Sequence, residues 1–181
     1  MDLTEKTLTQ DEKFVGRVVR LHVDSVALPD GHVGYREVVE HTGGVLIAPL
    51  TQDGALLFVR QFRYPYHKVL LELPAGKLEP GEDSLAAGLR ELKEEVGAVA
   101  GRTRSLGQFY PTPGYCSEII HMFLALDLTE GEATPDVDEF LEVERIALAD
   151  AVQMVLSGEI ADGKTQTAIL KINAILSSEF E

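Results

Sequence analysis

Glu91, Glu94 and Glu95 lie close together in a segment with helical periodicity. At about 100° per residue their side chains fall within an arc of about 100°, away from an apolar stripe that starts at Leu85. Clustered carboxylates supply the oxygen ligands that Mg²⁺ prefers, and this ion keeps several waters for a phosphate substrate. Like charges at i, i+4 also repel slightly. The residues alone therefore indicate either a cation site or a solvated acidic face.

The composition excludes several classes of partner. The chain of 181 residues has 30 Asp and Glu against 16 Lys and Arg, a formal net charge of −14. This acid excess argues against binding to a nucleic-acid backbone and against a polybasic membrane anchor. It is compatible with a phosphate ligand, because a bound divalent cation inverts the local charge.

The cellular setting is predicted from what the sequence lacks. One cysteine, Cys116, rules out an internal disulfide and a multi-cysteine zinc site. The N-terminal residues lack the basic and apolar regions of a signal peptide, and no apolar run approaches the ~18 residues of a membrane span. We expect a cytoplasmic protein.

The elements that must position the acidic cluster follow from hydrophobic periodicity and turn residues. Residues 15–28 and 35–40 predict a hairpin around a turn at 29–31, and the polar stretch 1–13 is expected to be a frayed end. Gly43 and Gly44 then separate an N-terminal β element, residues 1–42, from a main body, residues 43–181.

The main body alternates between predicted strands and helices. Strands are expected at 45–50, 55–62, 104–110, 119–128 and 140–147, and helices at 84–96, 148–156 and 164–176. Asp83 is a fair N-cap and Gly97 a fair C-terminal residue for the first helix. We expect an α/β fold, with a mixed sheet flanked by helices.

The acidic segment resembles a known signature. Gly76 is followed after five residues by Glu82, and after seven more by Arg90-Glu91-Leu92-Lys93-Glu94-Glu95-Val96-Gly97. This spacing is similar to the Nudix box, although the last position, usually a bulky aliphatic residue, is Ala98. The resemblance implies the Nudix α/β/α sandwich, with the small N-terminal antiparallel β element added to it. It also implies Mg²⁺-dependent hydrolysis of a nucleoside diphosphate linked to another group, with Mn²⁺ as a substitute.

The resemblance extends to a subgroup. Residues 36–41, 60–65, 71–76 and 110–114 resemble segments of bacterial ADP-ribose pyrophosphatases, and Pro113 lies 15 residues beyond Ala98, near the subgroup's spacing. This implies hydrolysis of ADP-ribose to AMP and ribose 5-phosphate by a homodimer. The alternatives are hydrolysis of another nucleotide sugar, GDP-mannose or ADP-glucose, and an inactive ligand sensor. Sensors tend to lose the box glutamates, which this chain retains.

The resemblance assigns roles to the residues of the box. Glu91 and Glu95 are expected to ligate the metal together with the backbone carbonyl of Ala75. Glu94 is a second candidate for a metal ligand or a water-orienting group. Arg90 is expected to hold the carboxylates in place, and a plain surface ion pair is its alternative.

Residues outside the box complete the expected site. The general base is expected in the acidic loop 129–139, where Glu139 is preferred over Asp136 and Asp138. The resemblance predicts substrate contacts for five residues: Arg63 at the diphosphate, Arg60, Glu118 near the terminal ribose or a metal, and Arg36 and Glu37 at the adenine. The chain has no Trp, so Phe14, Tyr35 and Arg36 are the options for stacking on the base.

Overall fold

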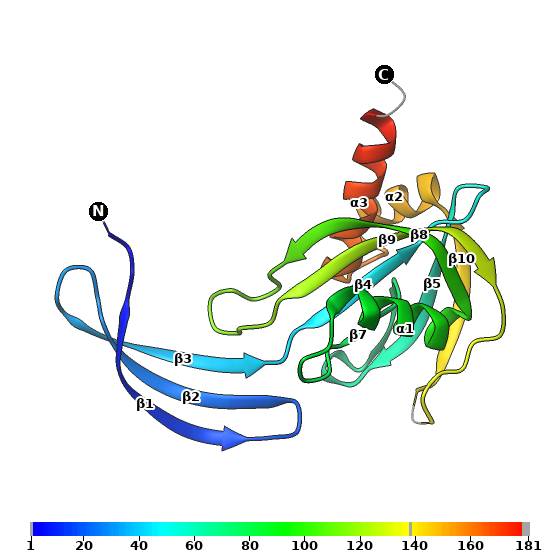
Figure 1. Ribbon diagram of the computed structural model, residues 1–181. Helices are drawn as coiled ribbons and strands as arrows, with labels where there is room; N and C mark the ends of the chain where they lie inside the picture. The colour runs from blue at the N-terminus through cyan, green and yellow to red at the C-terminus, as the bar shows by residue number, and fades with distance from the viewer. Residues whose placement is uncertain (1, 138, 179–181) are drawn as a thin grey trace. The chain divides into compact units, whose positions relative to one another are not determined.

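The computed structural model describes residues 2–137 and 139–178 (Figure 1). Contacts divide the chain into two compact units. The first contains the residues up to Gly43 together with Tyr110–Ile119. The second contains Gly44–Phe109 and the chain from Ile120 onward.

The first unit is a three-stranded antiparallel sheet in the order β1-β2-β3. Its strands are β1 (Lys6–Val15), β2 (Val19–Ala27) and β3 (Val33–His41). The predicted hairpin corresponds to β2 and β3, whose turn contains Gly31 at φ 88°. The expectation of a frayed end is wrong for residues 6–13, which pair with β2. Every side chain of β1 is exposed, so the strand has no apolar alternation that would reveal it in the sequence.

The segment 110–119 joins this unit through β3. The Val39 amide donates to the Tyr115 carbonyl at 2.7 Å, and the Ser117 amide donates to the Val39 carbonyl at 2.9 Å. In the same segment, Glu118 Oε1 lies 3.6 Å from His41 Nδ1.

The described residues of the second unit form two sheets. The first has the order β7-β4-β9-β8, formed by β4 (Gly44–Pro49), β7 (Ala75–Lys77), β8 (Ala98–Phe109) and β9 (Ile120–Glu130). It is mixed, because β4 runs parallel to β9 while the other pairs are antiparallel. The second has the order β10-β5-β6, formed by β5 (Ala55–Arg63), β6 (Lys68–Glu72) and β10 (Leu141–Ala147). A 3₁₀ turn, Tyr64–Tyr66, links β5 to β6.

In the described part of the chain, three helices pack on these sheets: α1 (Ser84–Val96), α2 (Leu148–Ser157) and α3 (Gly163–Ser178). Successive strand residues point to opposite faces, and the core is accordingly divided. Leu46 of β4 packs in a cluster with α2 and α3, whereas its neighbour Ile47 packs in a cluster with Leu92 of α1. Helices thus cover both faces, and the predicted α/β/α sandwich with a mixed sheet is confirmed. None of the described helices is long and apolar enough to cross a membrane.

Candidate active site

Helix α1 places the box glutamates. The Asp83 carboxylate accepts hydrogen bonds from the amides of Leu85 and Ala86, at 3.1 and 3.0 Å, and so caps the first turn. Gly97 ends the helix at φ 67°, a conformation that favours glycine. The predicted helix bounds and both caps are confirmed. The helix is therefore fixed at each end, and its side chains project from a rigid element.

Two of the three clustered glutamates are buried. Glu91 is 7% exposed and Glu95 is 2% exposed, so neither belongs to a solvated acidic face. Burial raises the pKa of Glu95 to about 8, the charge of Glu91 adds to this rise, and the Ala75 amide, which donates at 3.1 Å, opposes it. Burial also raises the pKa of Glu91, against the effect of Arg90. The donors around Glu91 and Glu95 do not fully offset the cost of burying two negative charges, and this arrangement favours a bound cation.

Gly76 leaves the space that the Glu91 carboxylate occupies. A Cβ atom at this position would lie 1.8 Å from Glu91 Oε1. With Glu91 in this position, the β7 backbone leaves no room for a Cβ atom, and a larger residue at position 76 would displace the carboxylate. Ala75, the residue before it, has its amide on Glu95. The first two residues of β7 thus face the two buried carboxylates.

The donor set suits a hard cation such as Mg²⁺. Carboxylate and backbone oxygens are the ligands available, and Mg²⁺ is bound through one or two carboxylates while it retains waters. Among the described residues, no three acidic, His or Cys side chains are already placed around one point for a metal. The chain therefore offers two buried carboxylates, with the rest of the shell left to main-chain oxygens, water and substrate.

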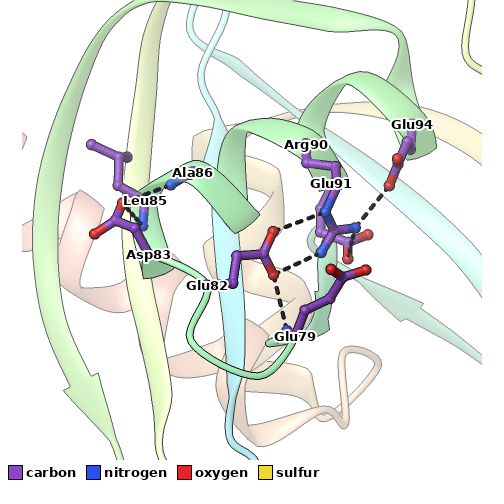
Figure 2. A network of polar contacts seen from close by, with 8 residues as sticks. All are labelled: Glu79, Glu82, Asp83, Leu85, Ala86, Arg90, Glu91 and Glu94. Atoms are coloured by element: carbon purple, nitrogen blue, oxygen red, sulfur yellow. Dashed lines mark hydrogen bonds and ion pairs between the residues drawn. The ribbon is translucent and has the colours of Figure 1, made fainter.

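Arg90 connects Glu91 of this pair to two further carboxylates, those of Glu82 and Glu94, as Figure 2 shows. Its Nε and Nη2 donate to Glu82 at 3.1 and 3.3 Å. Its Nη1 donates to Glu91 at 2.8 Å and to Glu94 at 2.9 Å. The hydrogen bonds that Arg90 donates to Glu82 raise the pKa of Arg90 against the effect of burial, and the charge of Glu91 and the hydrogen bonds to Glu91 and Glu94 add to this rise. This geometry allows Arg90 to orient Glu91 and Glu94, and its catalytic role stays a prediction.

The acidic loop is attached to the end of α1. The Gly131 amide donates to the Gly97 carbonyl at 2.8 Å, and the Thr134 amide donates to the Glu94 carbonyl at 2.9 Å. A Cβ atom on Gly97 would lie 2.5 Å from the Gly131 oxygen, so the loop packs directly on this glycine. The loop that carries the predicted base is thus held by the helix that carries the predicted metal ligands.

Glu139 lies within electrostatic reach of the buried pair. It is partly buried, its amide donates to the Asp136 carbonyl at 2.9 Å, and its charge contributes to the raised pKa of both Glu91 and Glu95. Asp136 is exposed. Asp138 lies outside the described residues.

Arg63 lies in an ion-pair network that sequence reasoning missed. Its Nε donates to Glu72 Oε1 and its Nη2 donates to Glu72 Oε2, both at 2.7 Å. Lys164 also contacts Glu72, and it lies 2.9 Å from Asp162. The one signal in the sequence is the position of Glu72, a charged residue within an apolar run; Lys164 and Asp162 gave none.

The remaining predicted substrate contacts have partners or exposure of their own. Arg60 donates to Glu144 at 2.7 and 3.1 Å and, three residues before Arg63, points to the other face of β5. Three of the predicted residues are in the first unit: Arg36 donates to Glu5, Glu37 is exposed, and Glu118 lies near His41. The stacking candidates Phe14 and Tyr35 are exposed in that unit. Their substrate roles stay predictions.

The raised pKa of Glu95 predicts how stability depends on pH. Between the ordinary pKa of 4.5 and about 8, the folded chain retains a proton that the unfolded chain releases. The free energy of unfolding without cation should therefore fall as pH rises through this window, by at most about 1.4 kcal/mol per pH unit. Mg²⁺ should restore stability mainly at the alkaline end. Thermal melts from pH 5 to 8.5, with and without Mg²⁺, measure this.

The variant Glu95→Gln is the control for these melts, because many other groups titrate over the same range. Its stability should depend less on pH than that of the natural chain, and Mg²⁺ should stabilise it less. Identical pH profiles for the two proteins would contradict the assignment of the effect to Glu95.

Known proteins resemble this chain in sequence and in fold. The model of the NUDIX domain matches residues 40–165. The chain is 43% identical to an ADP-ribose pyrophosphatase of Bacillus subtilis (strain 168), over 92% of this chain and 91% of that one. It is 41% identical to a methanol dehydrogenase activator of Bacillus methanolicus, over 91% and 90%. A crystal structure of an ADP compounds hydrolase aligns with a TM-score of 0.86 at 23% identity, covering 99% of this chain and 98% of that one, which shows a shared fold.

Proposed function

The chain belongs to the Nudix family, and from this premise we propose that it hydrolyses the diphosphate of ADP-ribose to AMP and ribose 5-phosphate with the help of Mg²⁺. The observation that carries the proposal is the buried pair Glu91 and Glu95, placed against the glycine of the box. The likeness to an ADP-ribose pyrophosphatase over nine-tenths of both chains supports the choice of substrate.

Residues of the second unit would bind the cation and position its ligands. Glu91, Glu95 and the Ala75 carbonyl would hold the cation, with Glu94 as a further candidate. A cation held there would neutralise charge on the diphosphate, orient it and lower the pKa of the attacking water. Arg90 keeps Glu91 and Glu94 in position through its hydrogen bonds.

Two further residues would act on the reactants. Arg63 would donate to the diphosphate oxygens, since a guanidinium binds phosphate with two parallel hydrogen bonds. Glu139 would accept the proton of the attacking water, because it is partly buried and close enough to affect both buried carboxylates. Most of the rate acceleration then comes from positioning and electrostatics rather than from covalent chemistry.

The finer properties are also proposals. Mn²⁺ should replace Mg²⁺, because it accepts the same oxygen ligands. The subgroup resemblance supports a homodimer, and the single cysteine supports a cytoplasmic location. The acid excess supports a small-molecule partner rather than a nucleic acid or a membrane.

A substrate panel tests the choice of nucleotide sugar. With Mg²⁺, kcat/KM for ADP-ribose should exceed the values for GDP-mannose and ADP-glucose by roughly tenfold or more, the discrimination available from a few pocket contacts. A preference for GDP-mannose or ADP-glucose would leave the hydrolytic chemistry intact and replace the substrate. Binding of these compounds without turnover of any of them would support a ligand sensor instead.

A further inference from the structure

Glu72 is a buried carboxylate that the proposed chemistry does not use. It ends strand β6, and it is only 1% exposed. An ionised carboxylate in such a place is costly unless it is paired and hydrogen-bonded. Burial alone would raise the pKa of Glu72, but the donors of Arg63 and the charge of Lys164 outweigh it and bring the pKa to about 2. Glu72 therefore remains ionised at neutral pH.

The pairing with Arg63 fixes the plane of the guanidinium. Both oxygens of Glu72 accept from it at 2.7 Å, in the parallel arrangement that gives the strongest and most directional ion pairs. A guanidinium has five N–H donors, and this pair uses one on Nε and one on Nη2. The Arg63 side chain is 36% exposed, so a ligand can reach it. Glu95 is among the charges that raise the pKa of Arg63, which places the guanidinium in the field of the acidic cluster.

Lys164, which is 92 positions later in the chain, also binds the Glu72 carboxylate. It is the second residue of α3, it is 13% exposed, and its ammonium contacts both Glu72 and Asp162. The first turn of α3 is also bonded to the backbone just after β6, because the Leu73 amide donates to Thr165 Oγ1 at 3.0 Å. The charges of Glu72 and Asp162 are thus balanced by those of Arg63 and Lys164. Lys164 of α3 holds the Glu72 carboxylate, which in turn orients Arg63.

We infer that Glu72, clamped by Lys164, is a positioning residue that holds the free edge of the Arg63 guanidinium ready for the diphosphate. The inference rests on the proposed function, since it assumes that Arg63 meets that group. Loss of the clamp should leave the charge of Arg63 in place and release its orientation. Substrate binding should therefore suffer more than the chemical step.

Steady-state kinetics with ADP-ribose and Mg²⁺ test this. Glu72→Gln should lower kcat/KM about 10- to 100-fold, the range seen when a group that orients a ligand is removed, mainly through a higher KM. Lys164→Met should act in the same direction, and Lys164→Arg should retain most of the natural KM. Asp53→Asn removes an exposed carboxylate that pairs with Arg145, and it should leave both constants unchanged.

A double-mutant cycle separates positioning from general structural support. If Glu72 acts through Arg63, Glu72→Gln should add little to the defect of Arg63→Met. Additive losses, or an unchanged KM in Glu72→Gln and Lys164→Met, would overturn the inference. If Glu72→Gln does not give a cooperative melt, the test rests on the KM values of Lys164→Met and Lys164→Arg. A natural chain that hydrolyses no nucleotide sugar would instead mean that the proposed function has failed.

Discussion

Glu95→Gln is expected to lower the turnover of ADP-ribose by about 10³-fold or more. The substitution keeps the shape of the side chain and an oxygen that can accept from the Ala75 amide. It removes one of two buried charges that would hold the cation. Charge stabilisation by a bound cation is worth several kcal/mol, and each ~1.4 kcal/mol is a factor of ten in rate. The measurement is kcat at saturating Mg²⁺ and substrate.

Loss of folding can be distinguished from loss of chemistry in this variant. Since the ionised form of Glu95 is disfavoured by burial, Glu95→Gln should be at least as stable as the natural chain at pH 8 without cation. A stable variant with greatly reduced turnover supports the assignment. A stable variant within tenfold of natural activity would remove Glu95 from the metal site.

Glu139→Gln should reduce kcat about 10²- to 10⁴-fold, the usual contribution of a general base, with KM nearly unchanged. The reason is that the amide cannot accept the proton of the attacking water, while the loop keeps its main-chain bonds to the end of α1. Single-turnover rates of the variant measure the chemical step without product release.

Two neighbours in the same loop are the matched controls for Glu139. Glu132→Gln changes an exposed glutamate and should have no effect on the rate. Asp136→Asn tests the rival base, and it should alter the rate by less than Glu139→Gln. If Asp136→Asn is slow and Glu139→Gln is not, the base is Asp136.

Much of the fold was predictable because local signals agreed. Helix α1 has an apolar stripe, a capping Asp83 and a terminal Gly97, and its predicted bounds agree with the structure. Strand β1 was missed because its polar, exposed residues carry no alternation. Strands β6 and β7 were missed because both are short, and β7 also lies in a stretch rich in proline and glycine.

The candidate site could be predicted where its residues are neighbours in sequence. The spacing of the box selected Glu91 and Glu95, but periodicity placed them away from the apolar stripe and gave no sign that both are buried. The clamp on Arg63 joins Glu72 to Lys164 across 92 positions, a contact that only the packing of α3 creates. Such tertiary ion pairs leave no periodic pattern in a single sequence.

The most direct test of the account is a product analysis with the natural chain. ADP-ribose is incubated with the protein and Mg²⁺, or with the protein and EDTA, and nucleotides and sugar phosphates are separated by chromatography. The account predicts equimolar AMP and ribose 5-phosphate with Mg²⁺ and neither with EDTA. Formation of neither product with Mg²⁺ or Mn²⁺, or equal formation in EDTA, would contradict it.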